Sequence, residues 1–147
     1  MKIIVLSLAL LFASVASAQT THNAQIDRGR YLVERVGMCG DCHSEHDQQG
    51  KPVEGKQLQG AVLPFKPTVP MPWADKSPAI AGLPNWTDAQ AVSFLMTGKL
   101  DGASPRPPMP GYRFNQADAR AIVAYLRSLG TAASSPKKGS HTGPGGR

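Results

Sequence analysis

The sequence predicts an all-α domain with one long irregular loop. Three stretches, 26–36, 87–97 and 115–129, combine helical spacing of apolar side chains with helix start or stop signals. Between the first two stretches, residues 44–86 contain repeated prolines and no sustained period of either kind. The chain also lacks the alternation of apolar strands with helices that a parallel α/β fold requires. These observations favour three helices and a loop that must find another way to pack.

The first helix is predicted over 26–36, after a short polar lead at 20–25. Tyr31, Leu32 and Arg35 fall at near-helical intervals from the preceding turn. Gly29 costs about 1 kcal/mol of helix propensity relative to alanine, so it suggests close packing against another backbone. Gly37 is the expected end of this helix.

The next segment, Cys39-Gly40-Asp41-Cys42-His43, contains both cysteines of the chain and a histidine directly after the second one. A Cys-x-x-Cys-His sequence indicates covalent attachment of a c-type haem. Two thiols three positions apart lie on one side of a helical turn, where they can add to the two vinyl groups of a porphyrin. Cys39 and Cys42 are thus the candidate anchors of one haem c, and His43 is the candidate iron ligand.

Three other interpretations of this segment are weaker. A structural zinc site needs about four nitrogen or sulfur ligands, and only His22, His46 and His141 remain beyond the motif. A thioredoxin-like redox pair is expected beside a βαβ pattern, which the chain does not show. A structural disulfide is compatible with an oxidising compartment but leaves His43 without a role.

The proline-rich loop at 44–86 is longer than a compact domain normally tolerates without a functional reason. A flat apolar cofactor supplies such a reason, because irregular chain can pack on it instead of on a sheet. The candidate lining residues are apolar, and ordinary burial is the alternative for each: Leu63, Phe65, Trp73, Ile80 and Leu83.

The two later helices carry clear end signals. Thr87 and Gln90 form a capping box at the start of the second, and Gly98 marks its end. Asn115 is the expected cap of the third helix, and Gly130 its stop.

Three regions follow from these patterns. Residues 1–18 resemble a cleaved signal peptide, with Lys2 before an apolar run and small residues at 16–18; an uncleaved anchor is the alternative. Residues 19–130 form the domain, and 131–147, rich in Ser, Gly, Pro and Lys, form a predicted disordered basic tail. We therefore expect an exported, periplasmic protein with no stable membrane span in its mature form.

The charge balance is too small to indicate a nucleic-acid partner. The chain has a formal charge of +6, but residues 19–130 contain 12 basic and 10 acidic side chains. The two propionates of a haem would roughly cancel that excess.

A second iron ligand is sought among the methionines, because a methionine sulfur fills the other axial position in electron-transfer cytochromes. Met1 lies in the signal, Met38 is too close to Cys39, and Met96 lies in a predicted helix. Met71 and Met109 remain, and each has a proline on both sides, which fixes the backbone and removes competing amide donors.

Several motifs together resemble class I cytochromes c over roughly residues 25–130. They are Asp27-Arg28-Gly29-Arg30-Tyr31-Leu32, Cys39-Gly40-Asp41-Cys42-His43, Thr97-Gly98-Lys99 with Asp101-Gly102, Pro107-Pro108-Met109-Pro110-Gly111-Tyr112 and Ala124-Tyr125-Leu126-Arg127-Ser128-Leu129. The resemblance is to small bacterial monohaem cytochromes and to haem domains of periplasmic dehydrogenase cytochrome subunits. The proline-rich stretch that contains Met71 has no close counterpart in the family pattern.

This resemblance implies a fold in which the first and last helices cross, here with Gly29 against Tyr125, and a middle helix beside them. It implies His43 and Met109 as axial ligands, with Met71 as the second choice for the distal one. The implied function is single-electron transfer between periplasmic redox partners, such as a dehydrogenase or a terminal oxidase, without bond chemistry of its own. The alternative is a haem protein with an open sixth position that binds a small ligand or peroxide.

Overall fold

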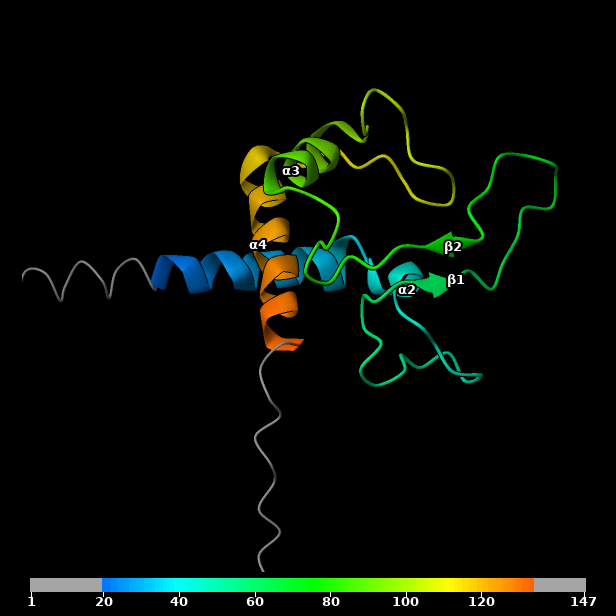
Figure 1. Ribbon diagram of the computed structural model, residues 1–147, viewed down its shortest axis with the longest axis horizontal. Helices are drawn as coiled ribbons and strands as arrows, with labels where there is room; N and C mark the ends of the chain where they lie inside the picture. The colour runs from blue at the N-terminus through cyan, green and yellow to red at the C-terminus, as the bar shows by residue number, and fades with distance from the viewer. Residues whose placement is uncertain (1–19, 134–147) are drawn as a thin grey trace, which may run out of the picture.

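The computed structural model describes residues 20–133, and its regular structure is mostly helical (Figure 1). A helix over 20–31 continues into the π-helical turn η1 (Leu32–Val36) and is followed by α2 (Gly40–His43). Two short strands, β1 (Ala61–Val62) and β2 (Lys76–Ser77), precede α3 (Asp88–Thr97) and α4 (Gln116–Ala133). The predicted helical domain with a long irregular middle is therefore confirmed.

The first helix begins earlier than the sequence suggested. Residues 20–25, expected as a polar lead, are helical and exposed. They show no apolar period because they contribute no buried face, yet they can extend a helix that is already anchored downstream. The predicted end at Gly37 is confirmed, since its amide donates to the Leu32 carbonyl at 2.7 Å and closes the π-helical turn.

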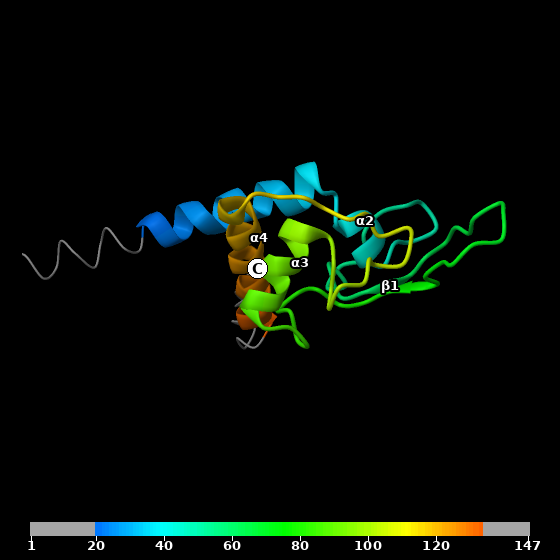
Figure 2. The same cartoon turned by 90° about the horizontal axis from the view of Figure 1, so that it is seen from above.

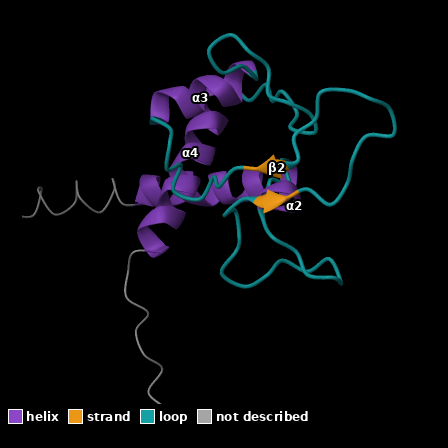
Figure 3. Ribbon diagram, turned by 45° about the vertical axis from the view of Figure 1, so that its right-hand side comes forward, coloured by secondary structure: helices purple, strands orange, loops and turns teal. Residues whose placement is uncertain are grey.

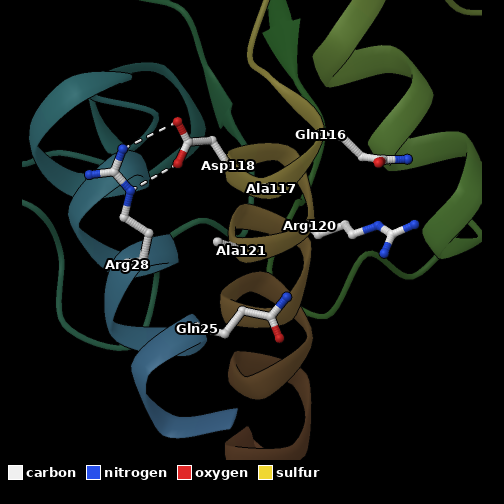
Figure 4. Close-up of a pocket in the computed structure, with 7 residues that line it drawn as sticks. All are labelled: Gln25, Arg28, Gln116, Ala117, Asp118, Arg120 and Ala121. Atoms are coloured by element: carbon white, nitrogen blue, oxygen red, sulfur yellow. Dashed lines mark hydrogen bonds and ion pairs between the residues drawn. The ribbon is translucent and has the colours of Figure 1, made fainter. Parts of the chain in front are cut away.

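The crossing of the first helix with α4 depends on Gly29, as predicted. A β-carbon at Gly29 would overlap the carbonyl group of Ala121 and lie 2.8 Å from the β-carbon of Tyr125. Beside this contact, the Arg28 guanidinium donates to both carboxylate oxygens of Asp118, at 2.9 and 3.2 Å (Figure 4). Backbone contact at the glycine and the ion pair together fix how the two helices cross.

The Tyr125 side chain makes a further contact across this interface. Its hydroxyl donates to the Glu34 carboxylate at 2.5 Å, and burial, together with this carboxylate, raises the pKa of Tyr125 to about 12. The Arg30 guanidinium lies over the same ring, 5.8 Å from its centroid.

The last helix does not stop at Gly130. It runs to Ala133, three residues further, and the glycine lies inside it. The reason is packing, because a β-carbon on Gly130 would lie 2.7 Å from the α-carbon of Gly82. Gly130 thus allows close approach of two backbones. Residues 131–133, predicted as the start of the tail, are helical instead, and residues 134–147 lie outside the described residues.

The hydrophobic core lies where the first helix, α3 and α4 meet (Figure 2). It is formed by Leu32, Val33, Leu58, Leu83, Ala91, Ile122, Val123, Tyr125 and Leu126. The capping box at Thr87 and Gln90, the left-handed Gly98 and the Asn115 cap are all present as predicted. Within residues 20–133, no helix combines the length and apolar character that crossing a membrane requires.

The loop between α2 and α3 is more ordered than its sequence indicates (Figure 3). The strands β1 and β2 pair antiparallel, with Ala61 opposite Ser77, and close the base of an arm formed by residues 63–75. Closer to the core, the Leu58 carbonyl accepts from the amides of Ile80 and Ala81 at 2.9 and 3.0 Å.

Arg127 of α4 secures the segment that leads into α3. Its guanidinium donates to the carbonyls of Gly82, Leu83 and Trp86 at 2.6, 2.9 and 2.5 Å, and to the Asp88 carboxylate at 2.8 Å. These carbonyls precede the helix and have no repeating partner of their own. One side chain therefore holds a whole irregular turn against α4.

We predict that Gly29→Val lowers the free energy of unfolding by about 1–3 kcal/mol, because the added methyl groups must force the crossing helices apart. Ala24→Val, at an exposed position of the same helix, is the matched control and should lower the free energy of unfolding by only a few tenths of a kcal/mol. Thermal unfolding of both variants measures the difference. Equal melting temperatures would contradict the crossing at Gly29.

We predict that Arg127→Lys destabilises the domain by about 1–3 kcal/mol, because a single ammonium group cannot replace a planar fork that reaches three carbonyls and a carboxylate. Arg120→Lys, on an exposed face of the same helix, should leave stability almost unchanged. Denaturant unfolding of the two variants compares them directly, and similar midpoints would show that the Arg127 contacts contribute little.

Candidate functional site

The predicted attachment motif forms a single helical turn. Cys39 is the N-cap of α2, and the His43 amide donates to the Cys39 carbonyl at 2.9 Å. The Cys39 amide in turn donates to Val33 of η1 at 3.0 Å, so the turn is tied to the end of the first helix. Cys39, Cys42 and His43 are thereby brought together on one rigid turn.

His43 is buried, with 6% of its surface exposed. Its Nδ1 atom lies 2.8 Å from the Pro78 carbonyl oxygen. A carbonyl can only accept, so Nδ1 carries the proton and Nε2 is left with a free lone pair. Burial lowers the pKa of His43, although the Pro78 hydrogen bond opposes this shift. The ring is therefore held as a neutral imidazole with one nitrogen available to a metal.

The base of the β1–β2 hairpin supports this turn from the other side. The Ser77 hydroxyl donates to the Cys42 carbonyl at 2.5 Å and accepts from the Ala61 amide at 3.0 Å. The Gly60 amide donates to the His43 carbonyl at 2.8 Å. Sequence reasoning missed Ser77 and Pro78 because they lie 35 residues beyond their partners. The prolines of this region indicated a loop, but they did not indicate what the loop contacts.

The two thiols are free and poorly suited to redox catalysis. Burial raises the pKa of Cys39 to about 11, and burial also raises the pKa of Cys42. A thioredoxin-like pair works through a thiolate of lowered pKa, so the shifts run against that interpretation. Within residues 20–133, no three His, Cys, Asp or Glu side chains gather as a metal-binding group, and His141 lies outside the described residues.

The two candidate methionines differ in their surroundings. Met71 is in the 63–75 arm and is 45% exposed, whereas Met109, in the loop between α3 and α4, is partly buried. The Met109 loop is held by the Ala74 amide, which donates to the Pro107 carbonyl at 2.8 Å. Within the loop, the Met109 amide donates to the Arg106 carbonyl at 3.2 Å and closes a turn. Figures 1 and 2 show this loop (yellow) at the same end of the molecule as α2.

The predicted lining residues divide into two groups. Leu83 belongs to the helical core and Ile80 packs against it, so ordinary burial accounts for both. Phe65 and Trp73 lie in the arm, where their rings pack edge to face with centroids 6.0 Å apart. Leu63 is buried near the base of the arm. The arm side chains are thus the ones left to contact a cofactor.

Trp73 provides a test of whether a haem fits these residues. Its Nε1 atom is the one buried side-chain nitrogen or oxygen in the described part of the chain that has no hydrogen-bond partner. A buried donor without a partner costs about 1–3 kcal/mol, which a carboxylate acceptor would recover. A haem carries two propionates, and together with an available imidazole nitrogen and two thiols on one turn, the residues fit this group.

Comparison with known proteins agrees with this chemistry. The family model described as "Cytochrome c" matches residues 26–130. The fructose dehydrogenase cytochrome subunit of Gluconobacter japonicus is 33% identical over 115 residues, which cover 74% of this chain and 23% of the relative.

Two further relatives show the same pattern. The cytochrome c subunit of a quinone-dependent alcohol dehydrogenase from Gluconacetobacter polyoxogenes is 30% identical over 71% of this chain and 24% of the relative. A diheme cytochrome c-type protein from Cereibacter sphaeroides is 30% identical over 70% of this chain and 35% of the relative. The chain thus spans about a quarter to a third of these relatives. With its helical fold and its attachment turn, the chain belongs to the cytochrome c family of electron-transferring haem proteins.

Proposed function

We propose that this protein carries one haem c, bound through Cys39 and Cys42, and that His43 and Met109 are the axial iron ligands. The observation that carries the proposal is the buried His43, which lies on the same turn as both cysteines. Its Nδ1 atom is hydrogen-bonded to the Pro78 carbonyl, which leaves Nε2 available to a metal. When bound, the haem supplies an iron that exchanges one electron. The surrounding residues bind and orient the group and limit the access of water.

The His43 contacts suit a ligand that must not move when the charge on the metal changes. The Pro78 carbonyl fixes the plane of the ring, and Gly60 fixes the backbone that bears it. These contacts would hold the ring in place whatever the charge on the metal, so little reorganisation of the protein would be needed on electron transfer. With Met109 in the other axial position, as proposed, the site would serve electron transfer without bond chemistry.

We infer that the redox partner is a dehydrogenase and that the protein works in the periplasm, with residues 1–18 as a cleaved signal peptide. The support comes from relatives named as cytochrome subunits of fructose and alcohol dehydrogenases. A terminal oxidase is the complementary partner, since an electron accepted from one protein must pass to another. The near balance of 12 basic and 10 acidic side chains over residues 19–130 gives no reason to propose nucleic acid.

The second candidate function is a haem site with an open sixth position that binds a small ligand or peroxide. It would follow if neither Met109 nor Met71 reached the iron. Carbon monoxide binding by the reduced protein separates the two functions, because a bound methionine sulfur must first be displaced.

We predict a single covalent haem on the mature protein. Mass measurement under denaturing conditions should show one haem adduct on the peptide that contains Cys39 and Cys42, because the chain has no other cysteines. The Cys39→Ser, Cys42→Ser double variant should lose the adduct. A colourless wild-type protein with a Cys39–Cys42 disulfide would rule out the proposal.

We predict that Met109→Ala abolishes the iron–sulfur charge-transfer absorption, lowers the reduction potential and opens the iron to carbon monoxide. Met71→Ala, the matched control between two prolines, should change none of the three. Spectra and a potential titration of both variants decide the assignment. The reverse pattern would assign the ligand to Met71. If neither variant loses the absorption, the candidate ligand becomes one of the histidines, His22, His46 or His141.

A further inference from the structure

The Tyr112 hydroxyl links two distant parts of the site. It donates to the Gly37 carbonyl at 2.7 Å, across 75 residues of sequence. Tyr112 is three residues after Met109, and Gly37 is two residues before Cys39. One hydrogen bond therefore joins the loop of the proposed distal ligand to the start of the attachment turn.

The hydroxyl also lies near the first cysteine. A β-carbon built on Gly37 would be 3.3 Å from Cys39 Sγ and 3.5 Å from Tyr112 Oη. Cys39 Sγ and Tyr112 Oη therefore both lie beside the Gly37 backbone. The contact is local to the attachment turn and not a remote surface bond.

The Tyr112 ring is held in place by Phe114. It stacks on Phe114 with centroids 5.1 Å apart and an interplanar angle of 26°. The Phe114 amide donates to the Leu95 carbonyl of α3 at 3.0 Å. Burial raises the pKa of Tyr112, so the hydroxyl keeps its proton at neutral pH. The donor is therefore permanent and its position is fixed by α3.

The other end of the Met109 loop is tied to a different element. There the Pro107 carbonyl accepts from Ala74 of the 63–75 arm at 2.8 Å. Met109 consequently lies between two long-range hydrogen bonds, one from the loop to the 63–75 arm and one from the loop to Gly37, just before the turn that bears the cysteines. Only the second is made by a side chain, so only that one can be removed by a single conservative substitution.

We propose that Tyr112 is a positioning residue, which holds the Met109 loop against the attachment turn and so keeps the methionine on the iron in competition with external ligands. The inference rests on the proposed His43 and Met109 ligation and goes beyond it by assigning the residue that maintains it. Tyr112 touches neither the iron nor a redox partner in this role.

The test is the affinity of the ferric holoprotein for imidazole, which must displace Met109 to bind. Tyr112→Phe keeps the ring and its stacking but removes the hydroxyl. We expect imidazole to bind roughly three- to tenfold more tightly, the effect of losing one net hydrogen bond that favours the closed loop. Tyr31→Phe, which removes an exposed hydroxyl from the first helix, is the control and should bind imidazole as the wild type does.

General loss of stability is separated from positioning by Gly29→Val, which weakens the fold at a helix crossing away from α2. Its imidazole affinity should match that of the wild type although it melts earlier. If it rises as much as in Tyr112→Phe, the positioning role is overturned. Phe114→Leu, which removes the stacking partner and leaves the hydroxyl, is the second variant and should show a smaller gain in affinity.

The outcomes distinguish this inference from the proposed ligand set. If the wild type excludes imidazole relative to Met109→Ala while Tyr112→Phe behaves as the wild type, Tyr112 does not position the loop and the Met109 assignment stands. If the wild type binds imidazole as tightly as Met109→Ala, both are wrong. Should Tyr112→Phe fail to load haem, an unchanged affinity in Phe114→Leu overturns the inference.

Discussion

The hydrogen bond between His43 Nδ1 and the Pro78 carbonyl is the contact on which the site depends. It selects the tautomer that leaves Nε2 free, and it fixes the ring in a buried environment where rotation would leave a polar atom unpaired. To make it, the chain must bring residue 78 back to residue 43, and the β1–β2 pairing in the intervening segment is consistent with that return. The same segment is also held by the Leu58 carbonyl, by Ser77 and by Arg127.

The candidate site combines the short helix α2 with residues from two loops, and the longer helices form the scaffold. The first helix, α3 and α4 supply most of the core, with Leu58 and Leu83 from the long loop, and they fix the ends of the loops that they flank. Single hydrogen bonds then join these segments: Ala74 to Pro107 between two loops, Ser77 of β2 to Cys42 of α2, and Tyr112 to Gly37 at the end of η1. Because the ends are fixed, each such bond restrains a short length of chain and costs less conformational entropy.

Glycines show where sequence reasoning succeeds and where it fails. Gly29 was correctly predicted as a close contact because it interrupts a helical pattern for no local reason. Gly130 was wrongly predicted as a stop, although it serves the same purpose against Gly82. Near the end of a helix, a packing glycine and a terminating glycine have the same local pattern, and only the partner backbone distinguishes them.

The sequence by itself determined that three main helices form, the caps of the later two, the Cys-x-x-Cys-His motif and the class of cofactor that it indicates, because each depends on residues a few positions apart. The start of the first helix and the end of the last were outside its reach. The sequence also reduced the methionine candidates for a distal ligand to two, each flanked by prolines. The tertiary structure alone decided the rest: Pro78 behind His43, the unpaired Trp73 nitrogen, the Arg127 clamp and the Tyr112 bond to Gly37. The Pro78, Arg127 and Tyr112 contacts join residues 35 to 75 positions apart, and no local pattern specifies them, because their partners are mostly backbone carbonyls that every residue possesses.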